Sequence, residues 1–177
     1  MSHFGVLAEF QSPAQLYRAC ERVRDAGYTK WDAHTPFPVH GLDGAMGMRR
    51  SRLPWIVLVL ALGGAATGFL LQTWVHNMAY PLTISGKPHF AWPAYVPITF
   101  ELGVLGGALG AVFGMFGLNQ LPRHHHPLFD AKRFARFSDD TFFISIEAAD
   151  PKFDANATSR LLAAVGASHV ELVEDTP

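Results

Sequence analysis

Two long uncharged stretches constrain the fold of this chain more than any other feature of its sequence. Residues 53–75 (LPWIVLVLALGGAATGFLLQTWV) carry no charged side chain, and residues 94–121 carry a single acid, Glu101. About 20 predominantly apolar residues are enough to cross a bilayer as an α-helix. A pair of buried core helices would be shorter and would keep a polar stripe. The sequence therefore predicts a two-helix transmembrane hairpin over residues 53–121, with an outer loop at 76–97.

The distribution of basic residues predicts the direction of this hairpin. Basic side chains lie before the first span and after the second, at Arg49, Arg50, Arg52, Arg123, Lys132, Arg133 and Arg136. The loop between the spans carries only Lys87. Because Lys and Arg next to transmembrane helices are enriched on the cytoplasmic side, both termini are expected in the cytoplasm and the loop outside.

Outside the hairpin, residues 4–34 and residues 142–175 present the same signals in the same order. Each segment begins with an apolar strand candidate, continues with a helix and ends with a second strand candidate. The helix start signals are Ser12-Pro13 and Asp150-Pro151, and the glycines that end the helices are Gly27 and Gly166. The buried helix positions predicted from the spacing are Leu16, Cys20 and Val23, and then Ala157, Leu161 and Val165.

Two such units in one domain are typical of a ferredoxin-like split βαβ fold. The fold class predicted is α+β, with residues 1–34 and 141–177 forming the two halves of one domain. The hairpin interrupts this domain between its second and third strands. Residues 35–52 are predicted to be a linker at the membrane surface, and residues 122–140 a linker that leaves the membrane.

Three consecutive histidines, His124, His125 and His126, follow the second span between two prolines. Zinc sites need ligands that converge with a defined geometry. Three neighbours on an extended chain do not converge, and no cysteine or acid cluster is placed to help. We expect these side chains to be interfacial anchors or partner contacts; a metal site and a proton relay are the alternatives.

Small residues repeat along both spans. The second span has glycines on one helical face, and the first span has a matching pair; together they are Gly103, Gly106, Gly107, Gly110, Gly114, Gly117, Gly64 and Gly68. Such repeats allow transmembrane helices to approach closely, so we interpret them as a helix-packing stripe. Glu101 lies on the opposite side of the second span. An ionisable group within a span usually has a partner, which makes Glu101 a candidate partner contact; plain exposure and a role in proton or quinone chemistry are the alternatives.

Several functional classes are disfavoured by composition. The single cysteine, Cys20, excludes an internal disulfide, a CxxC redox pair and a CxxCH haem attachment site. The net charge of −1 gives no general attraction to nucleic acid. No histidine lies in the apolar centre of either span, where a haem would need one. We therefore assign no catalytic, cofactor-binding or metal-binding residue, and expect no small-molecule substrate for the chain itself.

Three runs resemble the ActD subunit family of bacterial alternative complex III. They are TPFPVHGLDGAMGMRRSRLPWIVL (35–58), YPLTISGKPHFAWPAYVPITFELGVLGGALGAVFGM (80–115) and NQLPRHHHPLF (119–129). The resemblance implies a cofactor-free accessory or assembly subunit of a quinol-oxidising respiratory or photosynthetic electron-transfer complex. Such a subunit would lie in the bilayer of the bacterial inner membrane beside quinol-binding multi-span subunits. The alternative is a histidine-based metal sensor or an accessory protein of metal transport, against which stands the missing CxxC.

The predicted topology can be tested by labelling engineered cysteines in intact cells. A membrane-impermeant thiol reagent is expected to label Ser85→Cys in the outer loop and to leave Thr176→Cys unlabelled, because only the loop faces outwards. The unmodified chain, with Cys20 alone, provides the background. The reverse labelling pattern would contradict both the orientation and the expected cytoplasmic placement of the termini.

Overall fold

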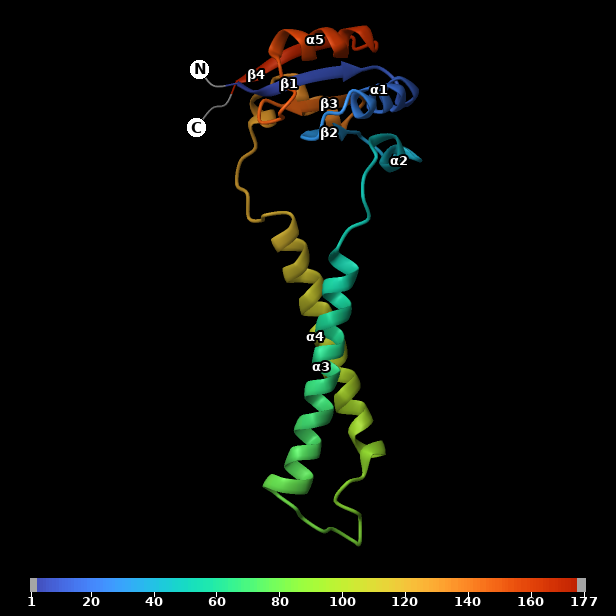
Figure 1. The fold of residues 1–177 in the computed structure, drawn as a ribbon, viewed down its shortest axis with the longest axis vertical. Helices are drawn as coiled ribbons and strands as arrows, with labels where there is room; N and C mark the ends of the chain where they lie inside the picture. The colour runs from blue at the N-terminus through green and yellow to red at the C-terminus, as the bar shows by residue number, and fades with distance from the viewer. Residues whose placement is uncertain (1–2, 175–177) are drawn as a thin grey trace. The chain divides into compact units, whose positions relative to one another are not determined.

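The computed structural model describes residues 3–174 and divides the chain into two compact units. One unit combines residues 1–49 with residues 124–177, and the other is formed by residues 50–123. The first is a mixed helix and sheet unit, and the second is the apolar helical hairpin (Figure 1). The two ends of the sequence therefore fold together although a membrane-length insertion separates them.

The first unit is built on a four-stranded antiparallel sheet with the strand order β2-β3-β1-β4. All four predicted strands are present, as β1 (His3–Phe10), β2 (Trp31–His34), β3 (Phe142–Glu147) and β4 (His169–Glu174). Strand β1 is central and pairs with β3 and β4, the two strands of the second half. Each half of the sequence thus depends on the other for its strand pairing.

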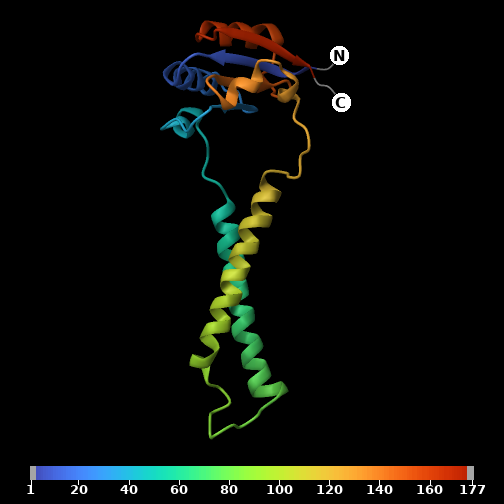
Figure 2. The same cartoon turned by 180° about the vertical axis from the view of Figure 1, so that it is seen from behind.

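Two helices cover one face of this sheet, α1 (Pro13–Asp25) and α5 (Ala155–Ala164) (Figures 1 and 2). The core between them takes alternate residues of β1 and β3, as the two-residue period of a strand requires. Its buried members are Val6, Ala8, Phe10, Leu16, Ala19, Cys20, Val23, Ala45, Phe142, Ile144, Ile146 and Leu162. Burial raises the pKa of the Cys20 thiol to about 12, so this cysteine packs as a small hydrophobic side chain.

The start of α1 agrees with the sequence prediction. Ser12 is the N-cap, and its hydroxyl accepts a hydrogen bond from the backbone N–H of Gln15 at 3.3 Å. Pro13 takes the first helical position, where a missing N–H costs nothing. Gly27 and Gly166, which follow the two helices, have φ values of +81° and +100°. Both are the left-handed positions expected at helix ends.

The predicted start of the second helix is wrong by four residues. Helix α5 begins at Ala155, and its N-cap is Asp154, whose carboxylate accepts from Ala157 N at 2.7 Å. Asp150 has another role. Its carboxylate accepts from the backbone N–H groups of Thr29 (2.6 Å), Lys30 (2.7 Å) and Lys152 (2.8 Å). Asp150 therefore joins the turn before β2 to the turn after β3.

The predicted buried face of the second helix is also shifted. Because α5 starts later, its buried positions are Thr158 and Leu162, while Ala157 is exposed and Leu161 and Val165 are half-buried. The Thr158 hydroxyl lies 3.0 Å from the Tyr28 hydroxyl, which satisfies a polar group inside the core.

The second face of the sheet is covered by the segment that follows the hairpin. The predicted linker at 122–140 contains two short 3₁₀ turns, η3 (Pro127–Asp130) and η4 (Phe134–Ser138). Leu128 and Phe134 are buried there against Leu7, Phe143 and Val173 of the sheet. The predicted linker at 35–52 likewise contains a short helix, α2 (Leu42–Met46), with Ala45 buried against the first core.

The hairpin consists of α3 (Leu53–Trp74) and α4 (Val96–Leu118), which lie side by side in both views (Figures 1 and 2). A π-helical turn, η1 (Val75–Ala79), extends the first helix, and a 3₁₀ turn, η2 (Trp92–Tyr95), precedes the second. Residues 53–79 and 92–118 are each long and apolar enough to cross a membrane. The loop between them is shorter than the predicted 76–97.

The Asp150 contacts predict a pH-dependent contribution to stability. Burial acts to raise the pKa of Asp150, but the hydrogen bonds from Lys30, Lys152 and Thr29 outweigh it and lower the pKa below its ordinary value. The stabilisation is therefore complete above the unfolded-state pKa of about 3.9. It is lost as the pH falls through the lower folded-state value. We expect Asp150→Asn to cost about 1.5–3 kcal/mol at pH 7, and less at pH 3.

Thermal unfolding of the full chain in detergent at the two pH values measures this difference. Asp139→Asn is the matched control, because Asp139 is exposed and its carboxylate forms no hydrogen bond within residues 3–174. An equal loss of stability at pH 3 and pH 7 for Asp150→Asn would show that its charge is not what holds the two turns.

Candidate functional site

The contact between α3 and α4 is made backbone to backbone at glycines. A Cβ atom added to Gly64 would collide with the carbonyl oxygen of Leu102, and one added to Gly106 would collide with the carbonyl oxygen of Leu60. At Gly68 the added atom would lie 3.1 Å from Cα of Thr99. At Gly64 and Gly106 no side chain fits between the helices, and at Gly68 a side chain would require the neighbouring backbone to shift by a few tenths of an ångström.

The remaining glycines of the predicted stripe face side chains of α3. Added Cβ atoms would lie 3.4 Å from Ala65 Cβ at Gly103, 3.4 Å from Ala61 Cβ at Gly107, 3.1 Å from Leu60 Cδ1 at Gly110 and 2.8 Å from Leu53 Cδ1 at Gly114. Gly117 departs from the predicted stripe, because an added Cβ would meet no atom of the described chain within 4 Å. The reason is length: Gly114 already faces Leu53, the first residue of α3.

Large apolar side chains cover the other side of α4. Five of them, Leu105, Leu109, Val112, Phe113 and Phe116, are 44–65% exposed. Glu101 is exposed on the same helix and makes no hydrogen bond or ion pair with any other residue in the range 3–174. The hairpin therefore uses its small residues internally and presents large apolar side chains and one carboxyl group outwards.

The three histidines turn in different directions. Nε2 of His125 lies 3.1 Å from Asp130 Oδ2. Nδ1 of His126 accepts a hydrogen bond from the backbone N–H of Leu128 at 3.4 Å. The His126 ring also makes a T-shaped contact with Phe4, with 5.0 Å between the ring centroids. His124 is exposed. Within residues 3–174, no three His, Cys, Asp or Glu side chains are grouped closely enough to hold a metal ion. The geometry gives His126 a structural role beside Phe4, near the start of the central strand β1.

Sequence reasoning missed an ion pair between a buried carboxylate and partly exposed arginines that joins the exit segment to the sheet. Glu9 on β1 is only 2% exposed. Its carboxylate accepts from Arg133 Nε at 2.8 Å, and Arg136 Nη1 lies 3.5 Å away. Gln11 Nε2 donates to the other oxygen at 3.0 Å. A buried carboxylate needs such partners, and the acid inside the apolar strand FGVLAEF was the available signal.

His34, also on the second face of the sheet, is held within the same layer. Its Nε2 lies 3.0 Å from Ser145 Oγ. Its ring makes a T-shaped contact with the ring of Phe134, with 5.0 Å between the ring centroids. Burial lowers the pKa of His34, against an opposing effect of Asp32. This histidine is therefore packed as a neutral ring beneath η4.

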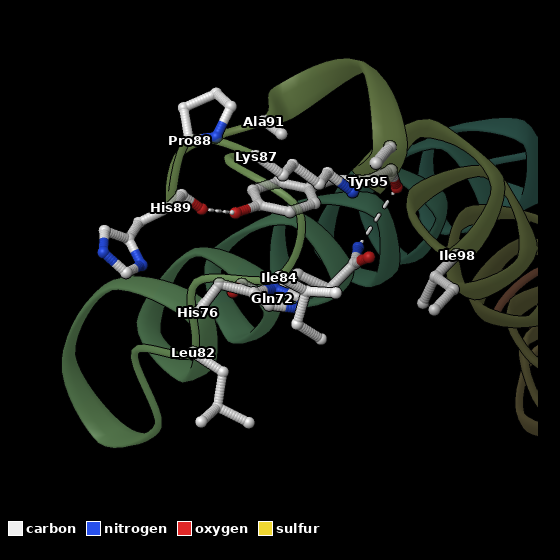
Figure 3. Close-up of a pocket in the computed structure, with 11 residues that line it drawn as sticks. Gln72, His76, Leu82, Ile84, Lys87, Pro88, His89, Ala91, Tyr95 and Ile98 are labelled. Carbon is white, nitrogen blue, oxygen red and sulfur yellow. Dashed lines mark hydrogen bonds between the residues drawn. The ribbon is translucent and has the colours of Figure 1, made fainter.

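A second missed feature lies where the hairpin meets its loop. Gln72 is buried between the helices, and its amide nitrogen donates to Gly68 O at 3.0 Å. The same nitrogen donates to Tyr95 O at 3.1 Å (Figure 3). His76 Nδ1 lies 3.0 Å from Gln72 O, and its ring stacks on Tyr95 with 5.3 Å between centroids. The signal in the sequence was a lone amide near the end of an uncharged span.

These side chains line a cavity of about 310 Å³. Its apolar wall comes from the loop and α4, and includes Leu82, Ile84 and Ile98. Lys87 and His89 of the loop complete the polar part of the lining (Figure 3). The Tyr95 hydroxyl donates to the His89 carbonyl at 2.9 Å, which ties the loop to the start of α4.

Fold and hairpin together define a membrane protein with two apolar membrane-length helices, whose first and last segments build one sheet unit. The sequence model of the family described as alternative complex III, ActD subunit, matches residues 4–172. The chain therefore belongs to the ActD family, whose members are subunits of a quinol oxidoreductase complex. No curated protein matches the chain.

The close glycine contacts give a prediction for the hairpin. Gly106→Ala is expected to lower the free energy of unfolding by about 1–3 kcal/mol. Even a methyl group meets the carbonyl oxygen of Leu60, so the helices must separate. Gly117→Ala is the matched control, since its methyl group has open space. The measurement is thermal unfolding of the full chain in detergent. Equal behaviour of the two variants would show that the hairpin does not depend on the Gly106 contact.

Proposed function

We propose that this chain is an accessory or assembly subunit of alternative complex III, which binds other subunits and holds no redox cofactor of its own. The observation that carries the proposal is the division of the hairpin into two sides. The glycines close the contact between α3 and α4, and the large side chains of α4 remain exposed. In a family of complex subunits, such a face suits contact with another membrane helix.

Glu101 supports a protein partner for this face in addition to lipid. Exposed leucine and phenylalanine side chains are compatible with either, because lipid tails are as apolar as leucine. A carboxyl group in a span instead requires a polar partner or access to water. Since Glu101 has no partner within residues 3–174, we infer that a donor on a multi-span subunit of the complex supplies one.

The extramembrane unit is proposed to have the ferredoxin-like fold. Its strand order β2-β3-β1-β4, with α1 after β1 and α5 after β3, supports this interpretation. We further propose that the chain lies in the bacterial inner membrane with both termini in the cytoplasm. The basic residues around the two membrane ends at 49–52 and 123–136 support that orientation.

The proposed lack of a cofactor rests on the chemistry of the candidate ligands. Cys20 is buried with a raised thiol pKa, which suppresses the thiolate that metals bind. His125 and His126 are engaged by Asp130 and Leu128. These contacts favour the subunit role over a histidine-based metal sensor or transport accessory protein.

Assembly and turnover measured separately test the proposal. We expect Glu101→Gln and a Leu109→Ala/Phe116→Ala pair to lower the yield of assembled complex about fivefold, the equivalent of about 1 kcal/mol of lost helix contact. Quinol oxidation per haem in the purified complex should stay unchanged, because these side chains are not in the redox path.

Leu70→Ala is the control for the removal of an exposed leucine side chain. Leu70 is 64% exposed but lies on α3, outside the proposed partner face of α4. An intact complex that has lost turnover in Glu101→Gln would contradict the accessory role and place this carboxyl group in the chemistry. Haem or iron in stoichiometric amount on the isolated chain would contradict the proposed lack of a cofactor.

A further inference from the structure

The cavity at the loop end of the hairpin presents two hydrogen-bond acceptors in fixed orientations. Both amide hydrogens of Gln72 are directed to the carbonyl oxygens of Gly68 and Tyr95. Its Oε1 atom is therefore left as an acceptor, and no described residue donates to it. The amide cannot be reversed without placing an acceptor against two carbonyl oxygens.

His76 is fixed in the same way. Its Nδ1 faces the carbonyl oxygen of Gln72, which can only accept, so Nδ1 carries a proton. In the neutral ring Nε2 is then an acceptor. Stacking on Tyr95 holds the ring plane. Two acceptors whose own hydrogen bonds set their direction thus line one cavity (Figure 3).

Lys87 adds a cation to this lining, and Leu82, Ile84 and Ile98 supply apolar walls. Among the residues described in the hairpin unit, Lys87 has no acidic partner. A ligand that matches the cavity must donate hydrogen bonds, carry a negative charge and offer an apolar portion. A zwitterionic amine head would place a second cation near Lys87, and a phosphate without hydroxyl groups would leave both acceptors unused.

The cavity lies at the loop end of the two membrane-length segments, where lipid headgroups are expected. It is formed where the membrane-length segments 53–79 and 92–118 join the loop. Trp74 and Trp92, both exposed, stand beside it in sequence, and tryptophan is enriched at the membrane–water interface. A volume of about 310 Å³ is enough for a small polar head, while a tail would continue along the helices.

We propose that this cavity binds the headgroup of an anionic, hydroxyl-bearing phospholipid of the phosphatidylglycerol type. The glycerol hydroxyls donate to Gln72 Oε1 and His76 Nε2, the phosphate pairs with Lys87, and an acyl chain lies against Ile98. The bound lipid would join loop and helices at the outer end of the hairpin. This assignment is independent of which subunits the chain contacts.

Native mass spectrometry of the full chain released from nanodiscs tests the assignment. The nanodiscs contain equal amounts of phosphatidylglycerol and phosphatidylethanolamine. The unmodified chain is expected to retain phosphatidylglycerol in preference to phosphatidylethanolamine. His76→Phe keeps the stacked ring and removes the acceptor, and Lys87→Gln removes the cation. Each should reduce phosphatidylglycerol retention about fivefold, the effect of one lost hydrogen bond or ion pair of about 1 kcal/mol.

His169→Phe and Lys30→Gln are matched controls, because they make the same chemical changes at exposed residues of the sheet unit and should leave retention unchanged. A second arm adds a short-chain hydroquinone, which has two hydroxyl donors and no anionic group. Hydroquinone that displaces the lipid and binds equally to the unmodified chain and Lys87→Gln would overturn the lipid assignment in favour of a quinol head. Equal retention of both phospholipids, or retention unaffected by His76→Phe and Lys87→Gln, would overturn it as well.

Discussion

Close backbone contact between α3 and α4 is the constraint on which the rest of this architecture depends. At Gly64 and Gly106 the opposing carbonyl groups occupy the space of a side chain. Within lipid no water is released when apolar helices meet, so association requires such close contact. Because the glycines lie in the contact between α3 and α4, the large apolar side chains of α4 remain exposed and can contact lipid or partner subunits.

The same hairpin returns the chain to complete a sheet that its first segment cannot build alone. Strand β1 pairs on both sides with strands from beyond the insertion, β3 and β4. The returning segment also covers the second sheet face, where Arg133 meets the buried Glu9. An acid in a central strand is tolerable because its charge is paired and hydrogen-bonded. A residue range predicted to be a plain linker is therefore part of the folded unit.

Local signals predicted the elements well and misled where two signals competed. Ser12-Pro13 starts α1 as predicted, whereas Asp150-Pro151 has the same pattern of a capping residue before proline and does not start α5. There the carboxylate accepts hydrogen bonds from the backbone N–H groups of Thr29 and Lys30, which are 121 and 120 residues away in sequence. Helix periodicity carries no information about this distant contact. It therefore predicts a buried face of α5 at Leu161, whereas the structure buries Leu162.

Hydrophobic runs and glycine spacing by themselves predicted two closely packed, membrane-length helices. The repeated strand–helix–strand signals predicted two halves of one α+β unit. Those properties depend on side chains that are neighbours along the chain or one helical turn apart. Only the tertiary structure decided the pairing of Glu9 with Arg133, the open space at Gly117 and the cavity formed by Gln72, His76 and Lys87. Each of these depends on atoms brought together from distant segments, whose meeting no local pattern encodes.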